Sequence, residues 1–195
     1  MTRVFALLLA LEALALLLGG LGMAWIRTPF CHPCHPARDL DAFFLLYWSL
    51  VGLEALFSRL APASFGATEE LMRQLGRQLA LTPRPRLLAI SMALASALGE
   101  EVFFRGFLLS LLVRALGPGP GLLLAALVFA LFHPVPNRQV WLYPLYVFFA
   151  GVLFGLAYLL SGSLVPGMLA HFLYNLKGFF EALDEGEMPR PPRYP

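Results

Sequence analysis

Two adjacent carboxylates and an arginine lie in an otherwise apolar stretch of this chain, which reads GEEVFFRG over residues 99–106. Glu101 and Arg105 are four residues apart, so on a helix they share a face in the favoured order for an ion pair. Glu100 lies about 100° around the helix from its neighbour and has no local partner. A carboxylate without a partner in apolar surroundings takes up a proton readily, which is the property of a general base.

Two further pairs of residues repeat this spacing. His133 follows Phe129 by four residues, and Asn175 follows His171 by four residues, so each pair shares one helix face. A single histidine in an apolar helix is typical of a satisfied core residue. A carboxylate beside an imidazole makes a water nucleophilic, however, and His and Asn donors stabilise the oxyanion of a tetrahedral intermediate. Together with Glu100, these residues therefore indicate a hydrolytic site.

The composition predicts a helical membrane protein. Of the 195 residues, 59% are hydrophobic and 13% are charged, whereas soluble domains have about 45–50% apolar and about 25% charged residues. The formal net charge is +2. Because the basic residues are scattered among apolar stretches and form no stripe with interleaved aromatics, nucleic-acid binding is not expected.

Six apolar stretches are candidate membrane spans, although the fourth is short. We expect an all-α, polytopic bundle of about six transmembrane helices. An amphipathic helix should lie on the membrane surface at 68–81, where apolar residues recur at helical spacing between charged ones. The sequences GPGP at 117–120 and PVPN at 134–137 predict the turns on either side of the fourth span. The expected spans are residues 3–26, 40–61, 87–116, 119–133, 141–160 and 164–182.

The distribution of Lys and Arg predicts how the bundle is oriented. With the N-terminus in the cytoplasm, most of the 14 basic residues fall on cytoplasmic ends and loops. The sequence thus predicts an integral protein of the plasma (inner) membrane with both termini cytoplasmic. One transmembrane domain covers 1–182, with the catalytic motifs in 87–180. The tail at 183–195 is rich in proline and charge, so we expect it to be disordered in the cytoplasm.

The three motifs together resemble the CAAX-protease and bacteriocin-processing family of intramembrane endopeptidases. EExxxR begins at Glu100, FxxxH ends at His133, and HxxxN begins at His171. Each motif alone is short, but their order along a six-span apolar chain makes the resemblance specific. The resemblance covers about residues 87–180.

This resemblance implies hydrolysis of a peptide bond in a membrane-associated peptide or protein, with CAAX-type C-termini and bacteriocin leaders as candidate substrates. The first glutamate, with His133, would activate a water for attack on the scissile carbonyl. The second glutamate would be held by the arginine in support of the site. His171 and Asn175 would donate hydrogen bonds to the oxyanion. The implied catalytic residues are Glu100, Glu101, Arg105, His133, His171 and Asn175.

The resemblance leaves the cofactor open, because the family is described both as metalloproteases and as metal-independent glutamate peptidases. No cofactor is certain, and a divalent metal such as zinc is allowed. Glu100, His133 and His171 are the candidate ligands, since three protein ligands suffice for an open zinc site. The zinc-protease motif HExxH is absent.

Two lone acids and a pair of cysteines have no role in this interpretation. Glu12 and Glu54 either line the cavity or are neutral, and Glu54 is within reach of Arg59 or Arg105. The first loop reads CHPCHP over 31–36. The sequence leaves a disulfide, a metal site and free thiols as open alternatives for it.

Two other functions stay open. A serine-type intramembrane protease would use Ser163, which precedes His171, but both glutamates would then have no role. A non-catalytic immunity or peptide-binding membrane protein would use the same buried charges without any chemistry. Proteolysis that survives Glu100→Gln would contradict the glutamate mechanism.

Overall fold

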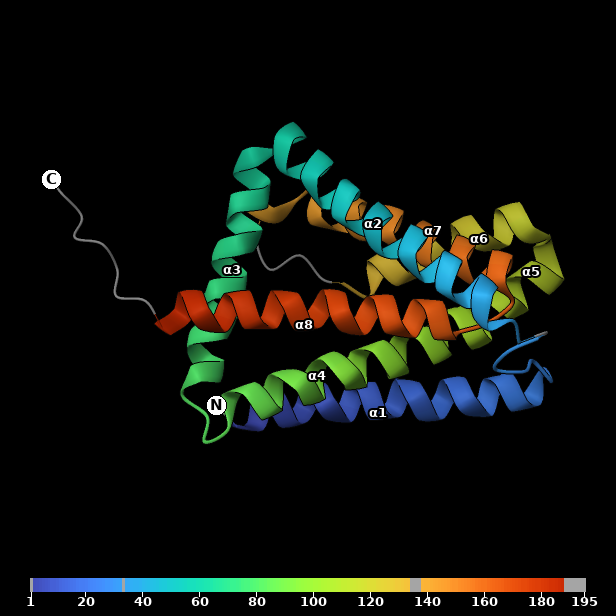
Figure 1. The fold of residues 1–195 in the computed structure, drawn as a ribbon, viewed down its shortest axis with the longest axis horizontal. Helices are drawn as coiled ribbons and strands as arrows, with labels where there is room; N and C mark the ends of the chain where they lie inside the picture. The colour runs from blue at the N-terminus through green and yellow to red at the C-terminus, as the bar shows by residue number, and fades with distance from the viewer. Residues whose placement is uncertain (1, 33, 134–137, 188–195) are drawn as a thin grey trace, which may run out of the picture.

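The computed structural model describes residues 2–32, 34–133 and 138–187, and it is a bundle of helices joined by short loops (Figure 1). Within these ranges there is no β-strand, only an isolated bridge between Cys31 and Ser163. The predicted all-α class is therefore confirmed. The helices are α1 (Thr2–Trp25), α2 (Pro36–Leu60), α3 (Pro62–Ala80), α4 (Pro85–Glu100), η1 (Glu101–Leu109), α5 (Ser110–Leu116), α6 (Pro118–Leu131), η2 (Arg138–Val140), α7 (Tyr143–Ser161) and α8 (Val165–Glu187).

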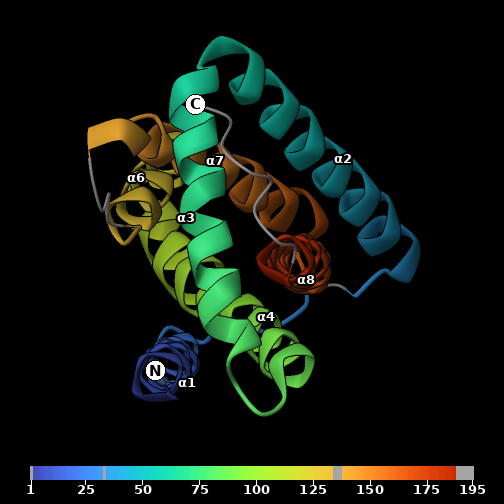
Figure 2. The same cartoon turned by 90° about the vertical axis from the view of Figure 1, so that its left-hand side faces the viewer.

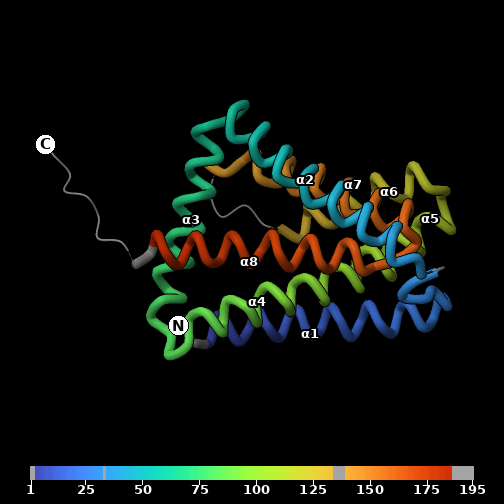
Figure 3. Tube along the Cα trace, in the orientation of Figure 1, coloured from blue at the N-terminus to red at the C-terminus, as the bar shows by residue number. Residues whose placement is uncertain are grey.

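Four helical stretches are long and apolar enough to cross a membrane. They are Arg3–Trp25, Pro36–Leu60, Pro85–Leu116 and Tyr143–Ser161. The third combines α4, η1 and α5 into one continuous rod, which Figure 3 traces along the Cα path. The apolar helix α6 has 14 residues, or about 21 Å at 1.5 Å per residue. By length and composition, neither α6 nor α8 belongs to this group of four, so the predicted count of six is not reached on these criteria.

The long helices lie side by side, and α3 crosses one end of them. In Figure 1 the start of α1 and the end of α8 lie at the same end of the molecule. Figure 2 looks at this end and shows α3 running across α4 and α8. The predicted amphipathic helix is thus confirmed as a helix, although it starts at Pro62 instead of 68. Its Glu70 accepts hydrogen bonds from Arg77 at 3.0 Å and from Gln74, and these bonds lower the pKa of the Glu70 carboxyl.

Helices α4 and α8 are antiparallel, and their contacts repeat every four residues. Asn175 donates to Ser96 at 2.9 Å. One turn further along α4 and one turn back along α8, Glu100 faces His171 at 3.8 Å. Toward the start of α4 and the end of α8 the interface becomes apolar, and residues of α1 and α3 join it in one buried cluster. Its buried members are Phe5, Leu79, Ala89, Met92 and Leu183.

In the first loop, Cys31 and Cys34 form a disulfide. Of the three alternatives that the sequence left open, this is the one that the structure contains. This loop is fastened to the turn between α7 and α8, where the His32 amide donates to the Gly162 carbonyl at 2.8 Å. Ser163 accepts a hydrogen bond from the Val165 amide at 3.2 Å. Ser163 therefore has the role of a helix N-cap for α8.

Two predicted boundaries were wrong. The helix α8 continues to Glu187, so residues 183–187 are helical and do not belong to a disordered tail. Leu183 is buried in the apolar cluster, and Glu185 forms an ion pair with Arg73 of α3 at 2.7 Å. These contacts stabilise the extra turn. Residues 188–195, the remainder of the expected tail, lie outside the described residues.

The other incorrect boundary is the end of the fourth span. The helix α6 stops at Leu131, so His133 lies two residues beyond the helix instead of ending it. The Gly117 backbone has φ 85°, a conformation that glycine adopts at little cost, and it makes the tight turn that GPGP predicted between α5 and α6. The PVPN segment at 134–137 lies outside the described residues.

The contact between α3 and α8 leads to a test with two glycines of one helix. A Cβ at Gly76 would collide with the backbone of Ala182, whereas a Cβ at Gly66 would meet no atom within 4 Å. We therefore expect Gly76→Ala to lower thermal stability by about 1–3 kcal/mol, as overpacking does. Gly66→Ala should be neutral or stabilising because alanine favours helix. Thermal unfolding of both purified variants in detergent checks this, and equal unfolding temperatures would contradict the α3–α8 contact.

Candidate active site

The two glutamates lie at the point where α4 becomes a π-helix. Glu100 is the last residue of α4, and η1 (Glu101–Leu109) is a π-helix of nine residues. Where the chain returns to α-helix, the Ser110 hydroxyl donates to the Arg105 carbonyl at 3.3 Å. π-Helical turns are rare and are often found at functional sites. The sequence analysis predicted one uninterrupted span here and did not predict the π-helix.

The predicted ion pair between Glu101 and Arg105 is confirmed. Arg105 Nη1 lies 3.1 Å from Glu101 Oε1, and the two residues are only 2% and 1% exposed. The guanidinium carbon is also 4.2 Å from the ring centre of Phe129 and 4.8 Å from that of Phe154. A buried charge with an opposite charge and two aromatic faces around it is well compensated.

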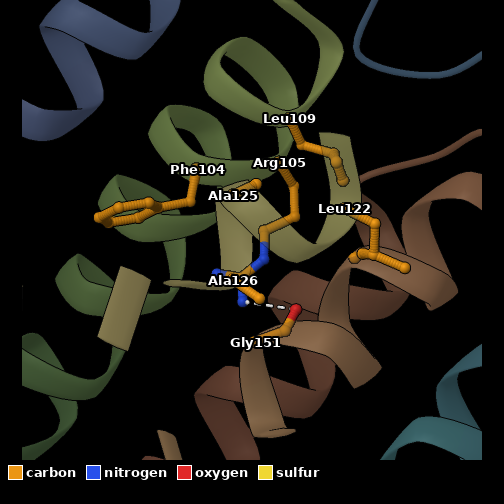
Figure 4. A pocket seen from close by; sticks show the side chains of 8 residues that line it. Phe104, Arg105, Leu109, Leu122, Ala125, Ala126 and Gly151 are labelled. Atoms are coloured by element: carbon orange, nitrogen blue, oxygen red, sulfur yellow. Dashed lines mark hydrogen bonds between the residues drawn. The ribbon is translucent and has the colours of Figure 1, made fainter. Parts of the chain in front are cut away.

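A small cavity adjoins the guanidinium (Figure 4). Arg105 Nη2 donates to the Gly151 carbonyl across it at a long 3.5 Å. The cavity measures about 10 Å³, which is close to the space that one water needs. It is therefore an internal feature of the arginine site and is too small to admit a peptide. Its lining residues are Phe104, Arg105, Leu109, Leu122, Ala125, Ala126, Gly151 and Gly155.

His171 comes from α8 and is held by the same carboxylate oxygen as Arg105. Its Nδ1 lies 3.0 Å from Glu101 Oε1. Because a carboxylate only accepts hydrogen bonds, Nδ1 carries the proton, and in the neutral imidazole Nε2 then carries the lone pair. A Cβ at Gly167, one turn earlier, would lie 2.7 Å from Glu101 Oε2. The glycine thus makes room for the carboxylate beside α8.

His133 is oriented in a similar way from the opposite side. Its Nδ1 lies 2.9 Å from the Phe129 carbonyl, which is one of the carbonyls left without a helical partner at the end of α6. Nδ1 therefore donates, and Nε2 points toward Glu100 Oε2 at 3.9 Å. The FxxxH spacing has a physical explanation here, because the residue four positions earlier supplies the acceptor.

Glu100 Oε2 is the atom on which these groups converge. Nε2 of His171 and Nε2 of His133 lie 3.8 and 3.9 Å from it. The oxygen is buried and receives no hydrogen bond from any residue in the described ranges. Acceptors that face one another at such distances are suited to a bridging water, which donates its two protons to two of them and presents its own oxygen to a reactant.

Asn175 lies one turn from His171 on α8 and is hydrogen-bonded to Ser96 of α4. Its Nδ2 donates to Ser96 Oγ at 2.9 Å, and the Ser96 hydroxyl in turn donates to the Ala93 carbonyl at 3.2 Å. The sequence analysis missed Ser96. The available signal was its position four residues before Glu100, on the same face of α4.

Glu54 belongs to a separate polar group. It accepts a hydrogen bond from Tyr174 at 2.7 Å and lies 3.7 Å from Lys177. The sequence analysis had considered Arg59 and Arg105 as its partners, and neither contacts it among the described residues. Both actual partners come from α8, whose position relative to α2 a sequence pattern does not give.

The donor set does not form a metal site in this structure. No group of three His, Cys, Asp or Glu side chains in the described ranges is close enough to hold a metal ion. Glu100, His133 and His171 approach one another without reaching that arrangement. We therefore derive the chemistry from the side chains and water alone.

Comparison with known families agrees with the motifs. Residues 82–177 match the model of the family described as type II CAAX prenyl endopeptidase Rce1-like. Searches of curated proteins and of solved structures gave no significant match. The matched residues contain all six site residues, from Glu100 to Asn175, but not α1, α2 or α3. The resemblance of the three motifs is thus confirmed, because residues 82–177 match the family of Rce1-like type II CAAX prenyl endopeptidases.

Proposed function

We propose that this protein is an intramembrane endopeptidase in which Glu100 activates a water for attack on a peptide bond. The match of residues 82–177 to an endopeptidase family supports the reaction class. The observation that carries the mechanism is the buried Oε2 of Glu100, which faces two imidazoles and receives no hydrogen bond from a described residue. A carboxylate in this state is a strong acceptor for a water proton.

In the proposed reaction, Glu100 takes a proton from the water as the water oxygen bonds to the carbonyl carbon. The carbonyl electron pair moves to its oxygen and forms the tetrahedral oxyanion. The carbon–nitrogen bond then breaks, the oxyanion re-forms a carbonyl, and Glu100 gives its proton to the leaving amine. His133, held at Nδ1 by the Phe129 carbonyl, accepts from the water through Nε2 and orients it.

His171 and Asn175 are the proposed oxyanion donors. The Nδ1–H of His171 is already hydrogen-bonded to Glu101. To donate to the oxyanion through Nε2 as well, His171 must be in the imidazolium form, which has a proton on both ring nitrogens. Glu101 and Glu100, at 3.0 and 3.8 Å, provide the negative charge that accompanies it. One amide hydrogen of Asn175 is directed to Ser96, and the other is left for the oxyanion.

We further propose that α6 and α8 also cross the membrane, which gives six spans with both termini cytoplasmic. The start of α1, the end of α8 and the helix α3 lie at one end of the bundle (Figure 1). Basic residues occur in these elements and at the start of α4, among them Arg73, Arg77 and Arg86. An integral protein of the plasma membrane with this arrangement would take membrane-associated peptides. C-terminal CAAX-type sequences are the first substrates to test, and bacteriocin leaders are the second.

Removal of the proposed base is the first test. Glu100→Gln keeps the shape of the side chain but cannot take a proton, so cleavage of a tagged panel of CAAX-type and leader peptides in liposomes should be lost. Glu69→Gln on α3, whose side chain is 54% exposed, is the matched control and should retain full activity. Residual cleavage by Glu100→Gln would contradict the mechanism.

The same assay with a chelator added tests whether the water is activated without a metal ion. We expect the purified protein to cleave equally with and without EDTA, because the proposed steps use only side chains and water. If EDTA abolishes cleavage and added zinc restores it, Glu100, His133 and His171 are instead assigned as metal ligands.

The buried ion pair gives a stability test. Arg105→Ala leaves the Glu101 carboxylate without its cation, which should cost about 3–5 kcal/mol. Glu100→Gln removes a charge that is expensive to bury and should leave thermal stability equal or higher. Both variants should be inactive. If Glu100→Gln proves the less stable of the two in detergent, the roles of the two glutamates must be exchanged.

Asn175 and Ser96 are tested together by kinetics. Asn175→Ala should lower kcat by about 100- to 1000-fold, as loss of an oxyanion donor does. Ser96→Ala should lower kcat less, and Ser96→Thr, which keeps the hydroxyl, should restore it. Ser91→Ala is the control on the same helix, since the Ser91 hydroxyl donates to the Leu87 carbonyl within its own helix, on an exposed face. An unchanged kcat for Asn175→Ala would remove it from the site.

A further inference from the structure

The helix α1 brings a third carboxyl to the site from outside the matched residues. Glu12 is the one acidic residue of α1, which is otherwise apolar and exposes many leucines along its length. Helices α1 and α4 run side by side (Figure 1). An ionisable side chain in such a helix is expensive, and it is typically retained where it faces a functional cavity.

A glycine allows Glu12 to approach the catalytic helix closely. A Cβ at Gly99 would lie 2.8 Å from Glu12 Oε2 and 2.6 Å from the Glu12 carbonyl oxygen. The carboxyl group therefore rests on the backbone of the residue that directly precedes Glu100. Glu12 thus lies beside the backbone that carries Glu100, within electrostatic range of Glu100 and His171.

Neither Glu12 nor Glu100 Oε2 has a hydrogen-bond partner among the described residues. The half-buried Glu12 forms no hydrogen bond or ion pair there, and the buried Oε2 of Glu100 receives no hydrogen bond. Two neighbouring carboxyls of this kind repel when both are ionised. With Glu12 neutral, its carboxyl proton is donated to a water that in turn donates to Glu100, so that one water pairs both groups.

We propose that Glu12 is a further catalytic residue, which holds the attacking water together with Glu100. This inference rests on the proposed endopeptidase function and adds a residue from a helix that the family match does not cover. The water would donate its two protons to Glu100 and His133 and accept one hydrogen bond from the neutral Glu12 carboxyl, so it would be fixed from α4 and from α1. Its remaining lone pair would then be directed at the scissile carbonyl.

The test compares two substitutions of Glu12 with a neighbouring control. Glu12→Leu removes both the carboxyl and its burial cost, so the folded protein should be at least as stable as wild type. We expect kcat to fall by about 10- to 100-fold, as for loss of a hydrogen bond to a charged group, while KM stays within about twofold. Glu12→Gln keeps a hydrogen-bonding group and should recover part of kcat. Ala13→Leu, on an exposed side of α1, should match wild type.

The outcomes separate this inference from the proposed function. Wild-type kcat in Glu12→Leu, with Glu100→Gln inactive, overturns the role of Glu12 and leaves the function standing. Cleavage by Glu100→Gln overturns the function itself. If Glu12→Leu fails to fold, Glu12→Gln decides. Its kcat must fall below wild type while its unfolding temperature is retained, and an unchanged kcat assigns Glu12 to packing and overturns the proposal.

Discussion

The Glu101 carboxylate is the group on which the arrangement of the site depends. A single oxygen, Oε1, accepts hydrogen bonds from Arg105 and His171 at 3.1 and 3.0 Å, and Glu101 is 1% exposed. Through Arg105 it is connected to the Gly151 carbonyl of α7 and to the Phe129 ring of α6. One buried charge therefore fixes η1, α6, α7 and α8 relative to one another, because any element that moved away would leave a charge or donor unpaired.

Small residues make this electrostatic arrangement possible. The bilayer offers little hydrophobic drive for helix association, so helices pack through close backbone approach. Gly167 leaves space for Glu101, and Gly99 lets α1 contact α4 beside Glu100. Gly151 packs against Ala126 of α6 and also supplies a carbonyl to Arg105. The glycines are thus placed where polar groups from different helices must meet.

The parts of the site that could be predicted from sequence are those fixed by helical spacing. Glu101 and Arg105 pair because they are four residues apart, and His171 and Asn175 face one helix for the same reason. Ser96 escaped prediction, and the sequence left the role of Glu12 open, because the contacts of both depend on which helix lies opposite, and periodicity gives a face without giving its partner. The π-helix and the end of α6 before His133 depend on local hydrogen bonding that apolar composition does not encode.

The contrast between the two adjacent glutamates follows from these partners. Both occupy the same apolar setting, but the 100° turn between them directs Glu101 toward Arg105 and Glu100 toward two imidazoles that lie beyond hydrogen-bond distance. Glu101 is a poor base, since its Oε1 already accepts hydrogen bonds from Arg105 and His171. Glu100 keeps its capacity to accept a proton because its neighbour binds the local donors. The structural role of Glu101 and the proposed chemistry of Glu100 are therefore two consequences of one distribution of hydrogen-bond donors.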